Sequence, residues 1–551
     1  MSVSPTATAH DRERSGEGPR TRSFLGTLIA GCLAVFVAQL ATTIPATLNG
    51  LFQADLQPLG SQLTWITAAF LLPIVVLELT FGVLGDLFGR RRLLVGGALL
   101  MVAGEVVAAS APDVILLCVG QVLSGIGAAA VIPTSLTVIA VRTDDGPRRA
   151  RVIAIWVTSL AVGNTLAPLL GGITANFGSW RWSFVVLAAL AALSALVSAL
   201  FAEESSAPEG RKLDVRGQIT IAVALIALLY AVVQGPADGW GSPLIVVAFV
   251  VAAVFLALFV RIENSAKAPL LPLDIFRNRS FSIAAVVAVV GMFAFLGAGY
   301  ATSMRMGPLQ HQSPMRIAVA FLVSNCWVAV LTPVTGRMLT RLAPRWVLGF
   351  GLALISAGGF WAATLPITDT SLLSITLPLG LIGIGFGFTV SSITATAVNT
   401  VPAHLAGMAS ATTSLLRDLG FALGPAVVGA IALSRADSLF STGLAQATDL
   451  SPAAQAAAGQ LAEAAGPLAV NSAPAGSPPA EAAGLALESL SNGFSTGYLV
   501  CGIAALLCCV LVVGALRDKT GGDGAASTPD SGETSTPDSG AADAPAEGAA
   551  V

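Results

Sequence analysis

The sequence predicts an all-α membrane protein that crosses the bilayer many times. Of its 551 residues, 55% are hydrophobic and only 11% are charged, whereas about a quarter of the residues of a typical soluble domain are charged. Apolar stretches of about 20 residues, the length that an α-helix needs to cross a bilayer, recur from Ser23 to Leu516. Because these stretches do not alternate with period two, a membrane β-barrel is not expected.

We expect fourteen spans, separated by short polar or turn-forming stretches. Their expected ranges are 23–48, 62–84, 92–111, 113–140, 150–174, 180–201, 216–234, 242–261, 281–306, 315–336, 345–365, 372–399, 407–434 and 494–516. Most of the 28 Lys and Arg residues then lie on the same side as the amino terminus. The positive-inside rule therefore predicts that both termini are cytoplasmic.

Three stretches outside the spans have biased composition. Residues 1–22 are polar and lack the apolar core of a signal peptide, so we expect a disordered cytoplasmic tail. Residues 435–493 are rich in alanine and proline, which predicts a long, mobile external loop, with a short helix at 452–465 as an alternative. Residues 517–551 are acidic and poor in apolar residues, which predicts a second disordered cytoplasmic tail.

A polar turn interrupts the apolar pattern at GVLGDLFGRRRLL, residues 82–94. Its glycines allow close helix contact, its aspartate can pair with an arginine, and its arginines favour the inner side of the membrane. The residues of this turn are Gly82, Gly85, Asp86, Gly89, Arg90, Arg91 and Arg92. A cluster that only sets topology would explain the arginines, but not the G-x-x-x-D-x-x-G-R-R-R spacing.

A second motif, GNTLAPLLGG, lies in the expected fifth span at residues 163–172. Its glycines and proline predict a kinked helix with one flat face, and a helix that only packs is the alternative. The motif residues are Gly163, Asn164, Ala167, Pro168, Gly171 and Gly172.

The polar turn resembles the cytoplasmic-loop signature of the major facilitator superfamily, and GNTLAPLLGG resembles the antiporter signature of exporters in that superfamily. Four further stretches are similar to its fourteen-span drug:proton antiporter branch, the EmrB/QacA-type multidrug efflux transporters. These stretches are SWRWSF (179–184), LDVRG (213–217), PLLPLDIFRNRSF (269–281) and PAHLAGMASATTSLLRDLGFALG (402–424).

This resemblance implies a major facilitator fold. Two six-helix bundles, at 23–201 and 269–516, would enclose a central cavity, with two additional transmembrane helices within 202–268 between them. It also implies that Asp86 and Arg90 latch the two halves together while the cavity faces outward, and that transport is directed outward.

The chain departs from the family pattern at three positions. Ala41 stands where the first span usually has an aspartate, and Gln121 begins QVLSG where the fourth span usually has R-x-x-Q-G. The loop motif has a related copy in the second half of the chain, PVTGRMLTRLAPR, and Thr340 stands there where an acid is common. The roles of the first two positions in proton coupling and cation recognition therefore cannot be transferred to this chain.

Other buried acids would have to carry protons. A charge at the centre of the membrane costs about 2.5–3.5 kcal/mol on insertion scales and is rarely kept without a function. The candidates are Glu78 in the second span, Glu105 in the third, and Arg417 with Asp418 in the thirteenth. A structural ion pair is the alternative for Asp418, and a hydrogen-bonded packing acid is the alternative for Glu105.

The resemblance implies a cavity lined by the first, second, fourth, fifth, ninth, tenth, twelfth and thirteenth spans. Its few polar and aromatic side chains suit a large, mostly apolar substrate, although each could instead serve helix packing. The candidates are Gln39, Thr42, Thr43, Gln121, Trp156, Asn164, Asn325 and Trp327.

An external turn, MRMGPLQHQSPMR, carries Arg305, His311 and Arg316 with few acids nearby. We hypothesise that these residues form a positive outer mouth that favours anionic or amphiphilic cargo. The alternative is that they extend to lipid phosphates at the membrane surface.

Together these features predict an exporter that works by alternating access, by proton-coupled antiport of amphiphilic or hydrophobic small molecules such as drugs, antibiotics or related metabolites. The alternatives are an uncoupled transporter or a lipid or metabolite transporter of the same fold, and a transporter-derived sensor. An enzyme is not expected, because the sequence has no nucleotide-binding loop, no HExxH and only three histidines. We expect no cofactor, no metal and no nucleic acid. The expected setting is a monomer in the inner membrane of a bacterium, with protons, lipid and a small-molecule substrate as partners.

Overall fold

The computed structural model describes residues 18–516, apart from 142, 144–145, 208–212, 267–268, 272, 400 and 402–405. All regular elements within these residues are helical, which confirms the all-α prediction. The expected tail at 517–551 and most of the one at 1–22 lie outside the described residues. Residues 18–22 belong to the first helix, so the predicted boundary of that tail is wrong at this point.

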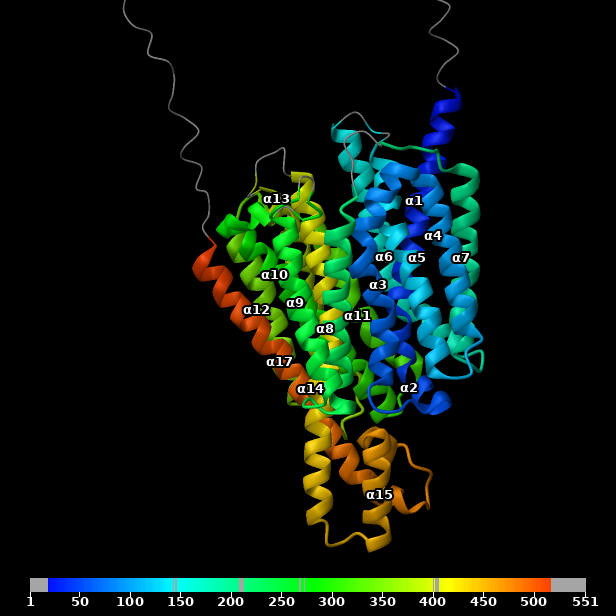
Figure 1. Ribbon diagram of the computed structural model, residues 1–551, viewed down its shortest axis with the longest axis vertical. Coiled ribbons are helices and arrows are strands. Elements are labelled where there is room, and N and C mark those ends of the chain that lie inside the picture. Colours follow the sequence, from blue (N-terminus) through cyan, green and yellow to red (C-terminus); the bar gives the residue numbers. More distant parts are fainter. Residues whose placement is uncertain are drawn as a thin grey trace, which may run out of the picture. The chain divides into compact units, whose positions relative to one another are not determined.

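The helices are arranged in two groups (Figure 1). The first group consists of α1 (Gly18–Thr43), α2 (Pro45–Leu56), α3 (Gln62–Phe88), α4 (Arg90–Ala109), α5 (Val114–Ala140), α6 (Gly146–Ala175) and α7 (Arg181–Phe201). The second group consists of α10 (Arg279–Met304), η3 (Arg305–Leu309), α11 (Pro314–Leu339), α12 (Pro344–Ala363), α13 (Leu372–Asn399), α14 (Ala406–Gln446) and α17 (Ala483–Ala515). Between them in the sequence lie α8 (Val215–Asp238), α9 (Pro243–Glu263) and the short η2 (Leu273–Arg277).

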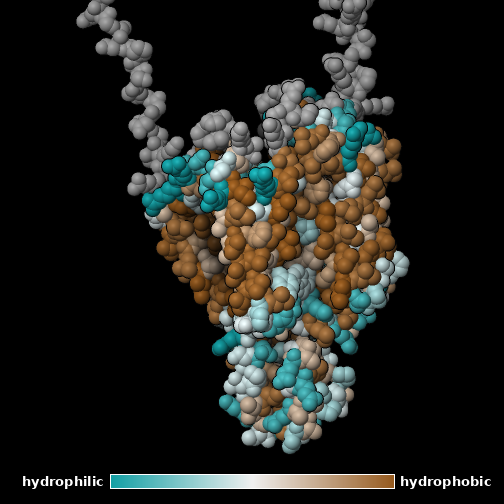
Figure 2. Space-filling view, viewed as in Figure 1, coloured by the Kyte–Doolittle hydropathy of each residue, from teal (hydrophilic) through white to brown (hydrophobic). Residues whose placement is uncertain are grey.

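Fourteen helices in the described part of the chain are long and apolar enough to cross a membrane, which confirms the predicted number of spans. Hydrophobic side chains cover most of the surface over these helices, and hydrophilic side chains gather at their two ends (Figure 2). We call the end where α3 joins α4 the motif end, and the opposite end the α2 end.

Local sequence explains where several helices begin and end. Asp113 and Ser242 accept hydrogen bonds from backbone N–H groups in the first turns of α5 and α9. The predicted first span is divided in two at Pro45, which has no N–H group to donate to the carbonyl four residues earlier, although Ile44 before it keeps helical backbone angles. The chain therefore ends α1 at Thr43 and begins α2 at Pro45.

Each group packs mainly on itself, and a few helices join the two groups. Within the first group α5 contacts α1, α3 and α4, and within the second α14 contacts α10 and α17. Contacts between the groups are made by α3 with α14, by α6 with α11, and by α2 with η3. The additional helix α8 packs on α9 and also touches both α3 and α14.

The stretch at 435–493 is helical, so the prediction of a loop there is wrong. It contains the end of α14, then α15 (Pro452–Ala465), α16 (Pro467–Asn471), η5 (Pro478–Ala482) and the start of α17. Prolines at first helical positions and a high alanine content explain these helices, because both favour a helix in those places. The alternative of a short helix at 452–465 is confirmed by α15.

This helical segment has its own apolar cluster, which includes Phe440, Ala458 and Val470. It also touches both groups at the α2 end. Ser472 accepts a hydrogen bond from the Gln53 side chain at 3.3 Å, and Asn471 donates one to the Pro308 carbonyl at 3.5 Å. The segment therefore lies over the α2 end of the spans (Figure 1).

Candidate functional site: a junction of acids between the two helix groups

Glu78 and Asp418 meet where α3 packs on α14. The Glu78 carboxyl group lies within hydrogen-bonding reach of the Asp418 carboxyl group, and Arg417 is close enough to act on Glu78 electrostatically. Glu78 is buried, and its Oε2 atom has no hydrogen-bond donor among the described residues. Two of the acids predicted as proton carriers therefore lie together, each on a different helix group.

The glycines of α14 explain why Asp418 faces α3. A Cβ atom at Gly420 would stand 2.3 Å from the Val289 carbonyl oxygen of α10, so only glycine allows this approach. Asp418 precedes Gly420 by two residues and so lies nearly on the opposite face of the helix. Packing of the Gly420 face on α10 thus directs Asp418 away from α10 and towards α3.

The Arg417 side chain makes few hydrogen bonds. Its Nη2 atom donates to the Ser414 hydroxyl at 3.3 Å, and its buried Nε atom has no partner in the described part of the chain. An arginine with unused donors beside two acids can respond to a change in their charge.

Glu105 lies elsewhere. It is buried between α4 and α5, where Ser124 donates a hydrogen bond to its Oε1 atom at 2.6 Å. Gly104 and Gly120 bring the two backbones together, because a Cβ atom on either would come within 3 Å of the opposite backbone. The structure thus places Glu105 in a packing interface, as the alternative interpretation expects, and away from Glu78 and Asp418.

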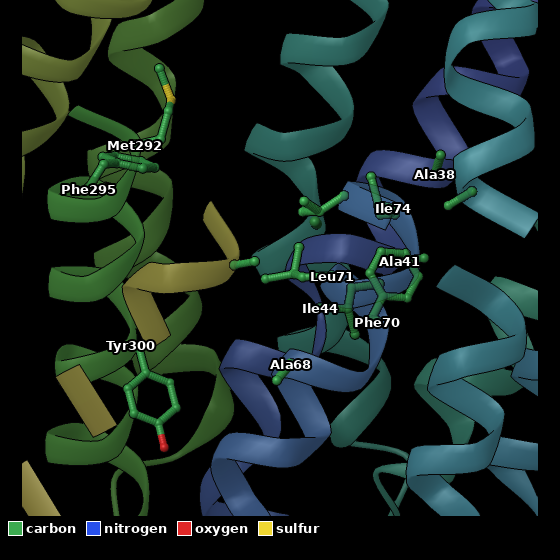
Figure 3. Close-up of a cluster of buried hydrophobic side chains, with 14 of the residues drawn as sticks. Ala38, Ala41, Ile44, Ala68, Phe70, Leu71, Ile74, Met292, Phe295 and Tyr300 are labelled. Atoms are coloured by element: carbon green, nitrogen blue, oxygen red, sulfur yellow. The ribbon is translucent and has the colours of Figure 1, made fainter. Parts of the chain in front are cut away.

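Position 41, where the family pattern has an acid in the first span, lies in apolar surroundings. Ala41 is buried and belongs to the same hydrophobic cluster as Phe70 and Ile74 of α3. The close-up shows these residues together with Ile44, while Met292, Phe295 and Tyr300 extend from α10 (Figure 3). An ionised group at position 41 would have no charged partner in this cluster.

The polar turn at 82–94 contains a buried ion pair. Arg90 Nη2 lies 2.6 Å from Asp86 Oδ1, and both side chains are less than a tenth exposed. Gly89 adopts a φ of +108°, which favours glycine, and a Cβ atom there would collide with Glu204. The turn is therefore held in one conformation by its own ion pair and by the chain after α7.

Further contacts of the turn are made with the chain that follows α7. The Arg90 N–H donates to the Ser205 carbonyl at 2.9 Å, and the Ala207 N–H donates to the Asp86 carbonyl at 2.9 Å. Arg92 lies 3.7 Å from Glu204 in an exposed ion pair. The Arg90 side chain also donates to the Ser205 hydroxyl, with 3.4 Å between Nη1 and Oγ. A latch between the two groups stays a prediction.

The glycines of the second motif allow α6 to contact helices on two sides. A Cβ atom at Gly163 would stand 2.7 Å from the Phe36 carbonyl oxygen of α1, and one at Gly171 would stand 2.4 Å from the Thr47 hydroxyl of α2. A Cβ atom at Gly172 would come within 2.9 Å of Ala318 on α11. The motif thus shapes the surface through which α6 joins the two groups.

Only some of the predicted cavity residues lie together. Thr43 donates to the Asn164 side chain at 2.6 Å, and the Asn325 side chain donates to the Asn164 carbonyl at 3.4 Å, which links α1, α6 and α11. The side chain of Gln39 lies beside Gly163, and the Thr42 hydroxyl donates to the Ala38 carbonyl of its own helix.

The other cavity candidates lie outside this chain of contacts. Trp156 donates to the Ser135 hydroxyl at 3.0 Å. Buried nitrogen atoms of Gln121 and Trp327 have no hydrogen-bond partner in the described residues.

Further residues that the sequence analysis did not identify close the α2 end. The hydroxyl groups of Thr64 and Tyr300 lie 2.7 Å apart, and Asn49 donates to the Ser303 hydroxyl at 2.8 Å. Each bond joins the first helix group to α10. These side chains are uncharged, so a pattern of buried acids does not indicate them. The available signal was that the sequence contains only three tyrosines, of which Tyr300 is one.

At the same end of the spans, Gly50 of α2 packs against Gly307 of η3. A Cβ atom at Gly50 would stand 2.9 Å from the Gly307 Cα atom. The backbones of the two groups therefore touch directly at the α2 end.

The predicted positive mouth is wrong for Arg305. Its side chain is buried, and its Nη1 atom donates to the Leu365 carbonyl at 3.0 Å while Nη2 donates to the Pro366 carbonyl. Arg316 is exposed and donates to the Thr370 carbonyl at 2.9 Å, and His311 is exposed with a φ of +52°. Burial of Arg305 follows from the π-helical turn of η3, which the sequence pattern did not indicate.

No group of three or more His, Cys, Asp or Glu side chains that could hold a metal ion occurs in the described residues. The chemistry available at the junction is that of carboxyl groups, an arginine and hydroxyl groups.

Comparison with known proteins identifies relatives over most of the chain. The family described as Major Facilitator Superfamily matches residues 31–425. The multidrug resistance protein Stp of Mycobacterium tuberculosis is 31% identical over 410 residues, which cover 74% of this chain and 76% of that protein. The tetracenomycin C resistance and export protein of Streptomyces glaucescens is 30% identical over 513 residues, which cover 91% and 93%.

Solved structures agree at the level of the fold. A bacterial homolog of the human lysosomal transporter Spinster, in an inward-facing and unoccupied conformation, superposes with a TM-score of 0.62. It is 17% identical in sequence, and the superposition covers 91% of this chain and 98% of that one.

Proposed function

Because this chain belongs to the major facilitator superfamily, we propose that it exports amphiphilic or hydrophobic small molecules across a bacterial inner membrane in exchange for protons. Membership in the family makes the chain a membrane transporter and not an enzyme. Export, the kind of cargo and the exchange for protons are the parts that we propose.

The contact between Glu78 and Asp418 is the observation that supports proton exchange most directly. Two carboxyl groups this close can form a hydrogen bond only when one of them carries a proton, because neither ionised group can donate. The contact also crosses between the two helix groups, so movement of α3 relative to α14 would separate the acids. Gain or loss of a proton is thereby linked to the arrangement of the groups.

Alternating access supplies the second part of the proposal. The two groups touch at the α2 end through Thr64 with Tyr300, Asn49 with Ser303, and Gly50 with Gly307. These contacts are hydrogen bonds and van der Waals contacts between small residues, which can separate and form again at modest cost. We propose that they open when cargo leaves and close when the transporter returns.

The energetics of this exchange are sufficient for export. One proton crossing a potential of 100 mV releases about 2.3 kcal/mol, enough for about fiftyfold accumulation of an uncharged cargo. The relatives named above are a multidrug resistance protein and a tetracenomycin C export protein. Their names support a drug or antibiotic as cargo for this chain as well, held by few polar contacts such as those of Thr43, Asn164 and Asn325.

The experiment is transport by the purified protein in liposomes with an imposed pH gradient. Tetracenomycin C and the dye Hoechst 33342 serve as cargo, and a pH-sensitive dye reports proton movement. We expect cargo to accumulate against its gradient, protons to move in the opposite direction, and both to stop when a protonophore removes the gradient. Cargo that only equilibrates would instead support an uncoupled transporter, and proteoliposomes indistinguishable from empty liposomes with both compounds would contradict the proposal.

A further inference from the structure

A groove of about 590 Å³ runs between α1 and α6 in the half of the spans nearest the motif end. Its walls are apolar side chains of both helices, among them Ile29, Phe36, Ile155 and Val162. Ile29 is 50% exposed and Ile155 is 42% exposed, although both lie within helices that are long and apolar enough to cross a membrane. Hydrocarbon from the bilayer would therefore fill this groove.

Three arginines lie at the motif end of α6, and two of them, Arg148 and Arg151, share the helix face that borders the groove. Arg148, Arg149 and Arg151 lie in the first turns of α6, all three are exposed, and Arg151 lines the groove itself. The Arg148 guanidinium lies 4.8 Å from the centre of the Phe24 ring of α1. Among the residues that the structure describes, no carboxylate forms an ion pair with any of the three.

The combination of an apolar groove and exposed arginines beside it fits one class of ligand. We propose that the α1–α6 groove binds an anionic phospholipid, with its phosphate on the arginines and an acyl chain along Ile29, Phe36, Ile155 and Val162. Arginine binds phosphate oxygens through paired hydrogen bonds, and basic residues near an anionic membrane surface are attracted to it. The lysine and arginine bias puts this end of the spans on the cytoplasmic side, where anionic lipids are available.

Two other ligands fit less well. A free phosphate ion would use the arginines and leave the apolar walls uncovered. A phospholipid with a choline headgroup would bring a positive charge towards three arginines. An anionic lipid would cover the apolar walls with its acyl chain and neutralise the arginines with its phosphate. Further along α6, Asn164 and Gly172 contact α11. The lipid would hold α6 against α1 beside the surface through which the two helix groups meet.

Native mass spectrometry of the purified full chain tests this inference with 1-palmitoyl-2-oleoyl phosphatidylglycerol and the matching phosphatidylcholine. We expect the chain to bind phosphatidylglycerol at least tenfold more tightly than phosphatidylcholine. Replacement of Arg148, Arg149 and Arg151 by glutamine is expected to remove this preference. Ile155→Trp fills the groove without a change of charge and is expected to weaken phosphatidylglycerol binding by a similar factor.

Matched controls come from the same protein. Arg279→Gln removes an exposed arginine at the start of α10, and Val247→Trp enlarges an exposed apolar side chain of α9. Both controls are expected to keep wild-type lipid binding. Each variant is first checked for folding by gel filtration and thermal denaturation, and Arg151→Gln alone replaces the triple variant if that variant does not fold.

Three results would overturn the inference: equal binding of the two lipids by the wild-type chain, unchanged binding after loss of the arginines, or equal weakening by the control Arg279→Gln. Displacement of phosphatidylglycerol by millimolar inorganic phosphate would also overturn it, because the apolar groove would then contribute nothing. These readouts measure lipid binding without transport, so they do not depend on the proposed exchange of cargo for protons.

Discussion

Glu78 of α3 and Asp418 of α14 lie on opposite sides of the junction between the two helix groups, with their carboxyl groups within hydrogen-bonding reach. The family's usual first-span acid is replaced by the buried Ala41, so the proposed exchange of protons would need a proton carrier among other residues. Two acids that share one proton at a moving interface would couple protonation to the arrangement of the helices. The chain could thus keep proton coupling with the acid in a different place.

Replacement of Glu78 by glutamine, or of Asp418 by asparagine, is expected to lower proton-coupled accumulation of cargo at least tenfold. Each amide keeps the size of the side chain and removes its ability to release a proton. Downhill equilibration of cargo is expected to continue, because the amides do not block the helices from moving. Transport in liposomes with and without a pH gradient measures both quantities.

Glu105→Gln is the matched control for these variants. The amide oxygen of glutamine can still accept the hydrogen bond from Ser124, so the contact between α4 and α5 is retained. We expect coupled accumulation within a factor of about two of the wild-type value. Full coupling in Glu78→Gln together with its loss in Glu105→Gln would transfer the proposed role to Glu105.

Gly50→Val is expected to favour a conformation that is open at the α2 end. Its Cβ atom would collide with the Gly307 backbone, which cannot move as a flexible side chain could. A cysteine placed at Ser303, which is fully buried in this structure, should then react faster with a membrane-impermeant maleimide. The labelling rate of the added cysteine measures how often the α2 end opens. The rate without this cysteine corrects for labelling of the native cysteines.

Gly96→Val provides the comparison, since a Cβ atom at Gly96 of α4 would meet nothing within 4 Å. Its labelling rate should match that of the unmodified glycine background. If both valine variants label at the same rate, the contact between Gly50 and Gly307 does not control closure.

Much of the architecture could be predicted because the bilayer imposes a strong pattern on the sequence. A span needs about 20 apolar residues whatever its neighbours are, so fourteen spans were evident from length and composition alone. Glu78 and Asp418 could be identified for the same reason, since buried acids are rare in such helices. Their contact could not be predicted, because it depends on how Gly420 orients α14 against α10.

Other features depend on tertiary context that the sequence pattern does not contain. The segment at 435–493 has the alanine and proline content of a loop, yet its prolines occupy first helical positions. Arg305 looked like a surface cation, but the π-helical turn of η3 buries it against two backbone carbonyls. Tyr300 and Asn49 were missed because an uncharged hydrogen bond between helices leaves no mark in hydropathy or charge.

Arg90→Gln is expected to destabilise the folded chain by about 3–5 kcal/mol, since it leaves the buried Asp86 without its cation. Arg92→Gln breaks only an exposed ion pair and is expected to cost about 0–1 kcal/mol. Thermal unfolding in one detergent, followed by tryptophan fluorescence, compares the two variants. Equal unfolding temperatures would mean that the buried ion pair does not stabilise the turn.

An ion pair between Asp55, which lies outside the spans, and Arg181, which begins one, predicts a dependence on pH. Asp55 at the end of α2 accepts hydrogen bonds from Arg181 at 2.7 Å and from the Trp180 indole at 2.8 Å. The Arg181 and Trp180 hydrogen bonds together hold the pKa of Asp55 below its ordinary value of 3.8. A lowered pKa in the folded state means that the ion pair stabilises the fold above pH 4 and loses this effect as the pH falls further.

Asp55→Asn is therefore expected to lower the unfolding temperature at pH 7 and at pH 5 by the same small amount. The pair is partly exposed, so it contributes about 0–1 kcal/mol. The difference from the wild-type chain should shrink towards pH 3, because the wild-type carboxyl group is then protonated too. Asp449→Asn, at an exposed aspartate with no ion pair in the described residues, should show no difference at any of these pH values. A difference for Asp55→Asn that grew below pH 4 would show that Asp55 stabilises the fold in its protonated form, contrary to the geometry of its contacts with Arg181 and Trp180.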